Sequence, residues 1–69
     1  TLPLTSIRAF AAAGRHLSLT AAARELHVTQ GAVSQQIARL EAYLGCALFV
    51  RDGRQLRFTP EGRSYHAAI

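Results

Sequence analysis

Apolar side chains recur at helical spacing in successive stretches between Thr1 and Leu44. Steps of three and four residues place them on one face of a helix. The spacing predicts a helix over about Ser6–Arg15, a two-turn helix that begins after Ser18, and a third helix over Gln30–Leu44. The predicted buried faces are Ile7, Phe10 and Ala11 in the first helix, Leu19, Ala22, Ala23 and Leu26 in the second, and Val33, Ile37, Leu40 and Leu44 in the third.

Polar residues at the ends of these stretches indicate where each helix begins. Thr5, Ser18 and Thr29 can each accept a hydrogen bond from a free backbone N–H group of the first turn. His27 falls at the corner between the second and third helices, where a positive φ angle is expected. Histidine adopts that conformation more often than most residues other than glycine. Val28 is then expected to insert into the core at this corner.

The periodicity changes after residue 47 to that of a β-hairpin. Two short β-prone runs flank the Asp52-Gly53 pair, which favours a tight turn. Leu56 and Phe58 are expected to face inward, between outward-facing polar neighbours. Because a two-stranded ribbon is unstable alone, it must pack on the helices, and the sequence predicts a wing over residues 49–58.

Together these elements predict a mainly α fold, a winged helix-turn-helix with a three-helix core and a two-stranded β wing. The domain would occupy residues 1–58. Thr59 as a cap and Pro60 at the first helical position predict a further helix over residues 59–69. This helix reaches Ile69 without a stop signal, so we expect the chain to be a fragment of a longer protein.

The composition is that of a small basic domain. The chain has 69 residues and a formal net charge of +4, and its basic residues are all arginine. This charge favours polyanions such as nucleic acids, although a mildly basic surface is also typical of other soluble proteins. The sequence contains no catalytic nucleophile with its base, no glycine-rich phosphate loop and no metal-ligand cluster. We therefore expect a protein that is not an enzyme and has no cofactor in this domain.

A single cysteine, Cys46, cannot form an internal disulfide or a zinc site. It follows Gly45, which is expected to end the third helix, and is predicted to be a small buried hydrophobe. No apolar run approaches the roughly 20 residues of a membrane span, and the N-terminus does not have the pattern of a signal peptide. The chain is therefore expected to be cytoplasmic, with no membrane partner.

The third predicted helix has a polar, uncharged face at its N-terminal end. In a helix-turn-helix, this end of the second helix of the pair points at base edges in the major groove. The alternative is a merely solvated face, but such faces favour Lys and Glu, and neither occurs near the start of this helix. The residues predicted to contact bases are Thr29, Gln30, Gly31, Ser34 and Gln35.

Further polar residues are predicted to contact the DNA backbone or the minor groove. Ser18 and Thr20 open a helix whose free N–H groups suit a phosphate, although Ser18 could act as a cap alone. Gln36 could instead face the second helix, whereas Arg39, a turn further along, is expected to meet a phosphate. The complete set is Ser18, Thr20, Gln36, Arg39, Arg51 and Arg54.

The hairpin arginines have competing explanations. Arg54 is predicted to enter the minor groove, where negative potential attracts arginine. The alternative is a charged ribbon that keeps its edges from pairing with other chains. Arg51 could pair with Asp52, Glu41 or a phosphate. Glu25 and Glu41 are expected to contact arginines on the helix surfaces.

The order of these signals resembles the N-terminal domain of LysR-type transcriptional regulators, over nearly the whole chain. The motifs that carry the resemblance are Leu4-x-x-Ile7-Arg8-x-Phe10, Ser18-x-Thr20-x-Ala22-Ala23-x-x-Leu26, Val28-Thr29-Gln30-x-Ala32-Val33-Ser34-x-Gln36-Ile37-x-x-Leu40-Glu41-x-x-Leu44-Gly45, Leu48-Phe49-x-Arg51 and Thr59-x-x-Gly62. The stretch Arg15-His16-Leu17-Ser18 further resembles the branch that contains the glycine-cleavage activator and the β-lactamase regulator.

The resemblance implies a bacterial regulator that binds double-stranded DNA at an interrupted palindrome. It also implies a homodimer held by a long linker helix that starts within residues 59–69, with Tyr65, Ala68 and Ile69 as dimer contacts. Tetramers on DNA are a further implication for the full-length protein. A C-terminal domain that binds a small-molecule effector is implied outside this chain. RNA polymerase is implied as a further partner, and the nucleoid as the location of the bound protein.

Two positions depart from the common family pattern. Gly31 stands where many members have proline, and Gln35 stands where many have arginine. Arginine favours guanine, whereas glutamine pairs with adenine through both ends of its amide, so a guanine contact is not carried over to position 35. The remaining alternatives are a winged-helix domain of another regulator family and a protein-interaction module, which would not need the polar helix face.

Overall fold

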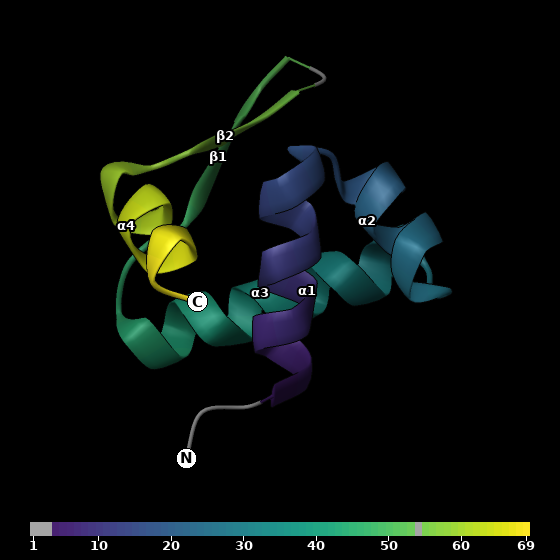
Figure 1. The fold of residues 1–69 in the computed structure, drawn as a ribbon, viewed down its shortest axis with the longest axis horizontal. Helices are drawn as coiled ribbons and strands as arrows, with labels where there is room; N and C mark the ends of the chain where they lie inside the picture. The colour runs from purple at the N-terminus through teal and green to yellow at the C-terminus, as the bar shows by residue number, and fades with distance from the viewer. Residues whose placement is uncertain (1–3, 54) are drawn as a thin grey trace.

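The structure, a computed structural model, describes residues 4–53 and 55–69. Within these ranges it contains four helices and one two-stranded antiparallel sheet (Figure 1). They follow the chain as α1 (Leu4–His16), α2 (Leu19–Leu26), α3 (Gln30–Leu44), β1 (Phe49–Asp52), β2 (Gln55–Phe58) and α4 (Pro60–Ala68). The predicted winged helix-turn-helix is confirmed. None of the described helices is long and apolar enough to cross a bilayer.

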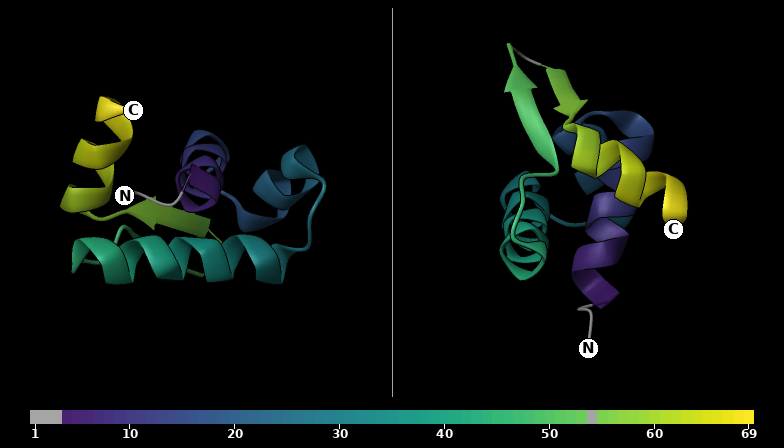
Figure 2. Two further views of the ribbon diagram at one scale, coloured as in Figure 1. Left: turned by 90° about the horizontal axis from the view of Figure 1, so that it is seen from below. Right: turned by 90° about the vertical axis from the view of Figure 1, so that its left-hand side faces the viewer.

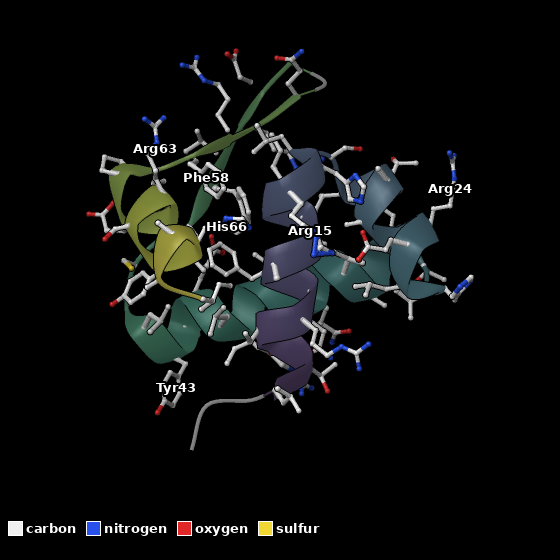
Figure 3. All side chains as sticks on the ribbon, in the orientation of Figure 1. Arg15, Arg24, Tyr43, Phe58, Arg63 and His66 are labelled. Atoms are coloured by element: carbon white, nitrogen blue, oxygen red, sulfur yellow. The ribbon has the colours of Figure 1, made fainter. Side chains whose placement is uncertain are left out.

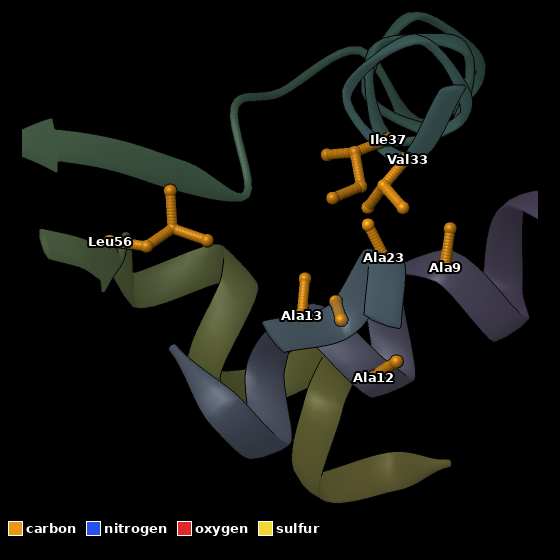
Figure 4. Close-up of a cluster of buried hydrophobic side chains, with 8 residues drawn as sticks. Ala9, Ala12, Ala13, Ala23, Val33, Ile37 and Leu56 are labelled. Atoms are coloured by element: carbon orange, nitrogen blue, oxygen red, sulfur yellow. The ribbon is translucent and has the colours of Figure 1, made fainter. Parts of the chain in front are cut away.

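Small side chains allow α1, α2 and α3 to pack closely. In Figure 1, α1 crosses α3 steeply, and α2 lies against both helices. Ala12, Ala13 and Ala22 are fully buried in the cluster between the helices. Val33 and Ile37 point into this cluster from α3 (Figure 4). Because alanine loses no rotamer freedom on burial, this close approach costs little side-chain entropy.

The helix ends follow from local hydrogen bonding. Ser18 and Thr29 are the N-caps of α2 and α3, and each side-chain oxygen accepts from a backbone N–H three residues later at 3.1 Å. His27 adopts φ 58° at the corner, and Gly45 adopts φ 76° at the end of α3. The predicted caps of α2 and α3, the corner and the stop at Gly45 are confirmed.

Three local predictions need correction. Helix α1 begins at Leu4, so Thr5 lies inside the helix and is not its N-cap. Val28 is 48% exposed and does not fill the core. Its backbone N–H bonds to the Ala23 carbonyl at 3.0 Å in the turn that ends α2, and this turn leaves the side chain at the surface. Cys46 is half-buried rather than buried.

Aromatic contacts anchor the base of the wing. Strand β1 pairs antiparallel with β2, and Phe49 lies opposite Phe58 at the end nearest the helices. The Phe49 ring stacks on Phe58 with centroids 5.2 Å apart and meets Phe10 of α1 at 5.5 Å. Leu56 is buried between exposed neighbours, so the alternation predicted for β2 is confirmed. This packing provides the support that an isolated ribbon lacks.

A tight turn joins the wing to α4. The Thr59 hydroxyl donates to the Ala47 carbonyl at 2.6 Å and accepts from the Gly62 N–H at 2.9 Å. Pro60 occupies the first turn of the helix, as predicted. A β-carbon at Gly62 would overlap the carbonyl oxygen of Leu48. Helix α4 therefore starts in a turn that requires glycine at position 62.

Candidate nucleic-acid interface

The outer surface of α3 faces solvent. Figure 2 shows α3 along one edge of the molecule, with the other elements on the same side of it. Val33, Ile37 and Leu40 are buried toward those elements, whereas Gln30 and Gln35 are exposed. The helix therefore presents a polar and uncharged surface at its N-terminal half.

The residues predicted to contact bases gather around this end of α3. Thr29, Gln30, Gly31 and Gln35 are exposed, and Ser34 is half-buried. The Thr29 hydroxyl already accepts the capping hydrogen bond. A β-carbon built at Gly31 would meet nothing within 4 Å, so the surface there is open. The exposed side-chain amides at this end of α3 are therefore those of Gln30 and Gln35.

A small groove of about 90 Å³ connects this end of α3 with α2 and the wing. Its lining includes Ser18, Thr20, Gln30 and Arg51. The Thr20 hydroxyl donates to the side-chain oxygen of Gln30 at 3.2 Å, which links the first turns of α2 and α3. The fold thus brings residues predicted to contact the DNA backbone next to one predicted to contact bases.

Gln36 faces α1 rather than the second helix. Its side-chain oxygen accepts from the hydroxyl of Ser6 at 2.8 Å, and Ser6 is completely buried. Gln36 also lines a groove with Arg8 and Val28. Arg39, three residues further along, is exposed. The structural partner of Gln36 was not foreseen from the sequence, because helical periodicity does not indicate which polar residue faces a buried hydroxyl.

Replacing Gln36 with alanine is expected to lower the free energy of unfolding by about 1–3 kcal/mol, because the buried Ser6 hydroxyl loses its partner. Urea denaturation followed by circular dichroism measures this loss. The double variant Ser6→Ala/Gln36→Ala removes both polar groups and should recover part of the stability. A Gln36→Ala protein as stable as the wild type would show that the hydrogen bond contributes nothing.

The ion pair on the wing differs from the prediction for Arg51. Asp52 pairs with Arg57 at 3.0 Å, and both side chains are exposed. In the antiparallel register, Arg57 lies diagonally across from Asp52 on the same face of the ribbon, whereas Arg51 points to the other face. Within residues 4–53 and 55–69, Arg51 forms no ion pair. Arg54, predicted to enter the minor groove, lies outside the described residues.

The acidic residues of α2 and α3 have structural partners. Glu25 contacts Arg15, which is labelled in Figure 3, so the predicted contact with an arginine is confirmed. The Glu25 carboxylate also lies 2.7 Å from the Nε2 of His16. Hydrogen bonds from His16 and then from Arg15 lower the pKa of Glu25. The Glu41 carboxylate accepts from the Leu48 N–H at 2.7 Å. Among the residues that the structure describes, Glu41 pairs with no arginine, contrary to the prediction, and its side chain instead holds the loop before the wing.

Acidification is expected to loosen the contact between α1 and α2. The pKa of Glu25 is lowered from 4.5 in the folded state. Its contribution to stability is therefore present above the unfolded-state pKa and is lost as the pH falls through the folded-state pKa. Between about pH 6 and pH 3, the Tm of the wild type should fall more than that of Glu25→Gln. The difference should be small, because exposed ion pairs contribute little, and equal pH slopes would count against this contribution.

The residues predicted as dimer contacts lie at the end of α4. Tyr65 is 42% exposed and Ile69 is 61% exposed, and Ala68 is also exposed. Tyr65 and Ile69 border an apolar groove of about 80 Å³ together with Ile7 and Leu44. In the part of the chain that the structure describes, no group of three or more His, Cys, Asp or Glu residues could hold a metal ion.

Known proteins resemble this chain in sequence. The profile of the family described as "Bacterial regulatory helix-turn-helix protein, lysR family" matches residues 4–63. The glycine cleavage system transcriptional activator of Escherichia coli (strain K12) is 59% identical over 67 residues, which are 97% of this chain and 22% of that protein. The HTH-type transcriptional activator AmpR of Citrobacter freundii is 57% identical over 63 residues, which are 91% of this chain and 22% of that protein. The chain thus spans about a fifth of the length of these relatives.

Solved structures also resemble it. The "CbnR_DBD-DNA complex" has a TM-score of 0.91 at 30% identity and matches 97% of this chain and 77% of that chain. The "BenM_DBD/benA site 1 DNA Complex" has a TM-score of 0.89 at 36% identity and matches 97% of this chain and 75% of that chain. The curated relatives named above are transcriptional activators rather than enzymes. The chain belongs to the LysR family of bacterial regulatory helix-turn-helix proteins.

Proposed function

We propose that this chain is the DNA-binding domain of a transcriptional regulator and that it recognises double-stranded DNA by sequence. In this proposal α3 lies in the major groove with its N-terminal half against base edges. The observation that carries the proposal is the exposed, uncharged polar surface around Gln30, Ser34 and Gln35. The major groove admits an α-helix and presents a distinct pattern of donors and acceptors for each base pair.

Gln35 is the base-reading residue with the clearest chemistry. It is exposed on the side of α3 that helical geometry places opposite the buried Val33 and Leu40. A glutamine amide donates and accepts together, which matches the N6 and N7 edge of adenine. The Gln30 oxygen accepts from Thr20, so its NH2 group is the part of that amide left to donate to a base.

Contacts to phosphates would position the domain on the duplex. Ser18 and Thr20 lie at the N-terminus of α2, where free N–H groups and the helix dipole favour an anion. Arg39 of α3 and Arg51 of the wing are both exposed and could each meet a phosphate. The net charge of +4 adds attraction to the DNA backbone. Structural similarity to the two domains solved as DNA complexes supports this arrangement.

We further propose that residues 1–58 form the DNA-binding domain and residues 59–69 begin a linker helix that dimerises. The exposed apolar side chains of Tyr65 and Ile69 support this division. In a longer regulator, a C-terminal domain would bind a small-molecule effector. A two-fold symmetric dimer would then bind two half-sites separated by a whole number of helical turns of DNA.

Selection of bound duplexes from a random pool tests this function directly. The intact regulator should enrich an interrupted palindrome, and its affinity should fall steeply between two salt concentrations in a gel shift. Enrichment of one asymmetric half-site would contradict the dimer. Failure to retain any duplex at low ionic strength would contradict DNA binding and favour a protein-interaction module.

A further inference from the structure

Helix α4 is attached to the domain at two separate places. The first is its opening turn, where the Thr59 hydroxyl bonds to Ala47 and Gly62 lies against Leu48. The second is His66, about one helical turn later, whose side chain points from α4 toward α1 beside Phe58 in Figure 3. A helix held at one point can pivot, whereas attachment at two points along its axis fixes its direction.

The His66 contact is close and specific. The ring lies against Gly14 of α1, where a β-carbon would overlap the imidazole. Its Nε2 lies 3.1 Å from the carbonyl oxygen of Ala11, so this nitrogen carries the proton and donates. The ring also meets Phe10 edge-on at 5.4 Å and Phe58 at 5.2 Å between centroids. One half-buried side chain of α4 thus contacts both α1 and β2.

We propose that His66 and Gly14 are positioning residues that set the direction of α4 and thereby the half-site spacing that the dimer accepts. The inference rests on the proposed function, because it requires α4 to lead into the dimer contact. Neither residue belongs to α2, α3 or the wing, the elements proposed to contact DNA. Each acts by fixing where α3 lies relative to the α3 of the second copy.

The lever effect of a linker helix makes this contact important for spacing. A helix of about 20 residues is about 30 Å long, so a tilt of about 10° at its base moves its far end by about 5 Å. One base pair along the duplex is about 3.4 Å. A small change in the direction of α4, caused by loss of the His66 contact, is therefore enough to change the preferred half-site spacing by a base pair.

The test measures binding of the intact regulator to operator duplexes whose half-site separation differs by single base pairs. The wild type should prefer one separation over those one base pair longer or shorter. In His66→Ala this preference should fall by about tenfold, while affinity for a duplex with a single half-site stays unchanged. Gly14→Ala should act in the same way because it displaces the ring, and the double variant should add little to either change.

Two further variants keep the result interpretable. His66→Leu retains apolar contact with the aromatic rings and removes only the bond to Ala11, so a folded protein with a weakened spacing preference is expected. Ser64→Ala, on the exposed side of α4, is the matched control and should keep the wild-type profile. An unchanged spacing profile in His66→Ala and His66→Leu would overturn the inference. Failure of the wild type to bind a single half-site would instead overturn the proposed function.

Discussion

Alanine at position 62 is expected to lower the free energy of unfolding by about 3 kcal/mol, because its β-carbon would overlap the Leu48 carbonyl oxygen. That oxygen is backbone and also accepts from the Thr59 N–H at 3.1 Å, so it cannot rotate away as a side chain could. A domain of this size has a total stability of roughly 3–10 kcal/mol. Urea denaturation of Gly62→Ala should therefore show a much lower midpoint or a partly unfolded protein in water.

The matched control is the same substitution at Gly31. A β-carbon there would meet nothing within 4 Å, and the residue lies in the first turn of α3. Alanine at this position should raise the stability by up to about 1 kcal/mol through its higher helix propensity. Equal effects of Gly62→Ala and Gly31→Ala would mean that the close approach at Leu48 does not constrain the fold.

Loss of the Gln35 amide is expected to weaken binding to the selected operator by about 1–3 kcal/mol, which is about five- to 150-fold. The preference for one base pair in each half-site should relax at the same time, because the bidentate contact to adenine is lost. Gln35→Arg should move that preference toward guanine. Quantitative gel shifts with each base substituted in turn measure both changes.

Gln36 provides the comparison for this experiment. It is the neighbouring residue of the same type, yet its amide bonds to Ser6 of α1 rather than extending from the outer surface. Gln36→Ala should destabilise the fold and leave the base preferences of the folded fraction intact. Relaxed specificity in Gln36→Ala, with unchanged specificity in Gln35→Ala, would mean that the wrong face of α3 has been assigned to DNA.

Local sequence signals were sufficient to predict most of the fold. The ends of α2 and α3 were predicted because Ser18, Thr29 and Gly45 make contacts within a few residues of their own positions. The wing was predicted because alternation and the turn pair are local as well. Val28 shows the limit of this approach, because the turn that ends α2 determines whether its side chain faces the core or the surface.

Contacts between distant parts of the chain could not be predicted. Gly14 and His66 are 52 positions apart, and in the sequence Gly14 indicates only a small loss of helix propensity. Gly62 likewise contacts Leu48 across the whole wing. The helical pattern suggests an arginine partner for Glu41. It cannot show that the loop after α3 folds back and donates a backbone N–H group to that carboxylate.

The candidate site was predicted in outline for a physical reason. An exposed helix face must be polar, and the absence of charge near the start of α3 can be read from the sequence alone. The structure adds the groove between Ser18, Gln30 and Arg51, which depends on how α2 and the wing pack. The structure also shows that Asp52 pairs with Arg57 and not with Arg51, because the strand register places Asp52 and Arg57 on the same face of the ribbon.

A single NMR titration tests the central claim that the outer face of α3 lies against base pairs. The isotope-labelled domain is mixed with an operator duplex, and shifts are followed for backbone amides and for the side-chain NH2 groups of Gln30 and Gln35. This arrangement predicts the largest changes in these two side chains and in the first turns of α2 and α3. Changes confined to α4 and the N-terminal half of α1, with both glutamine side chains unaffected, would contradict it.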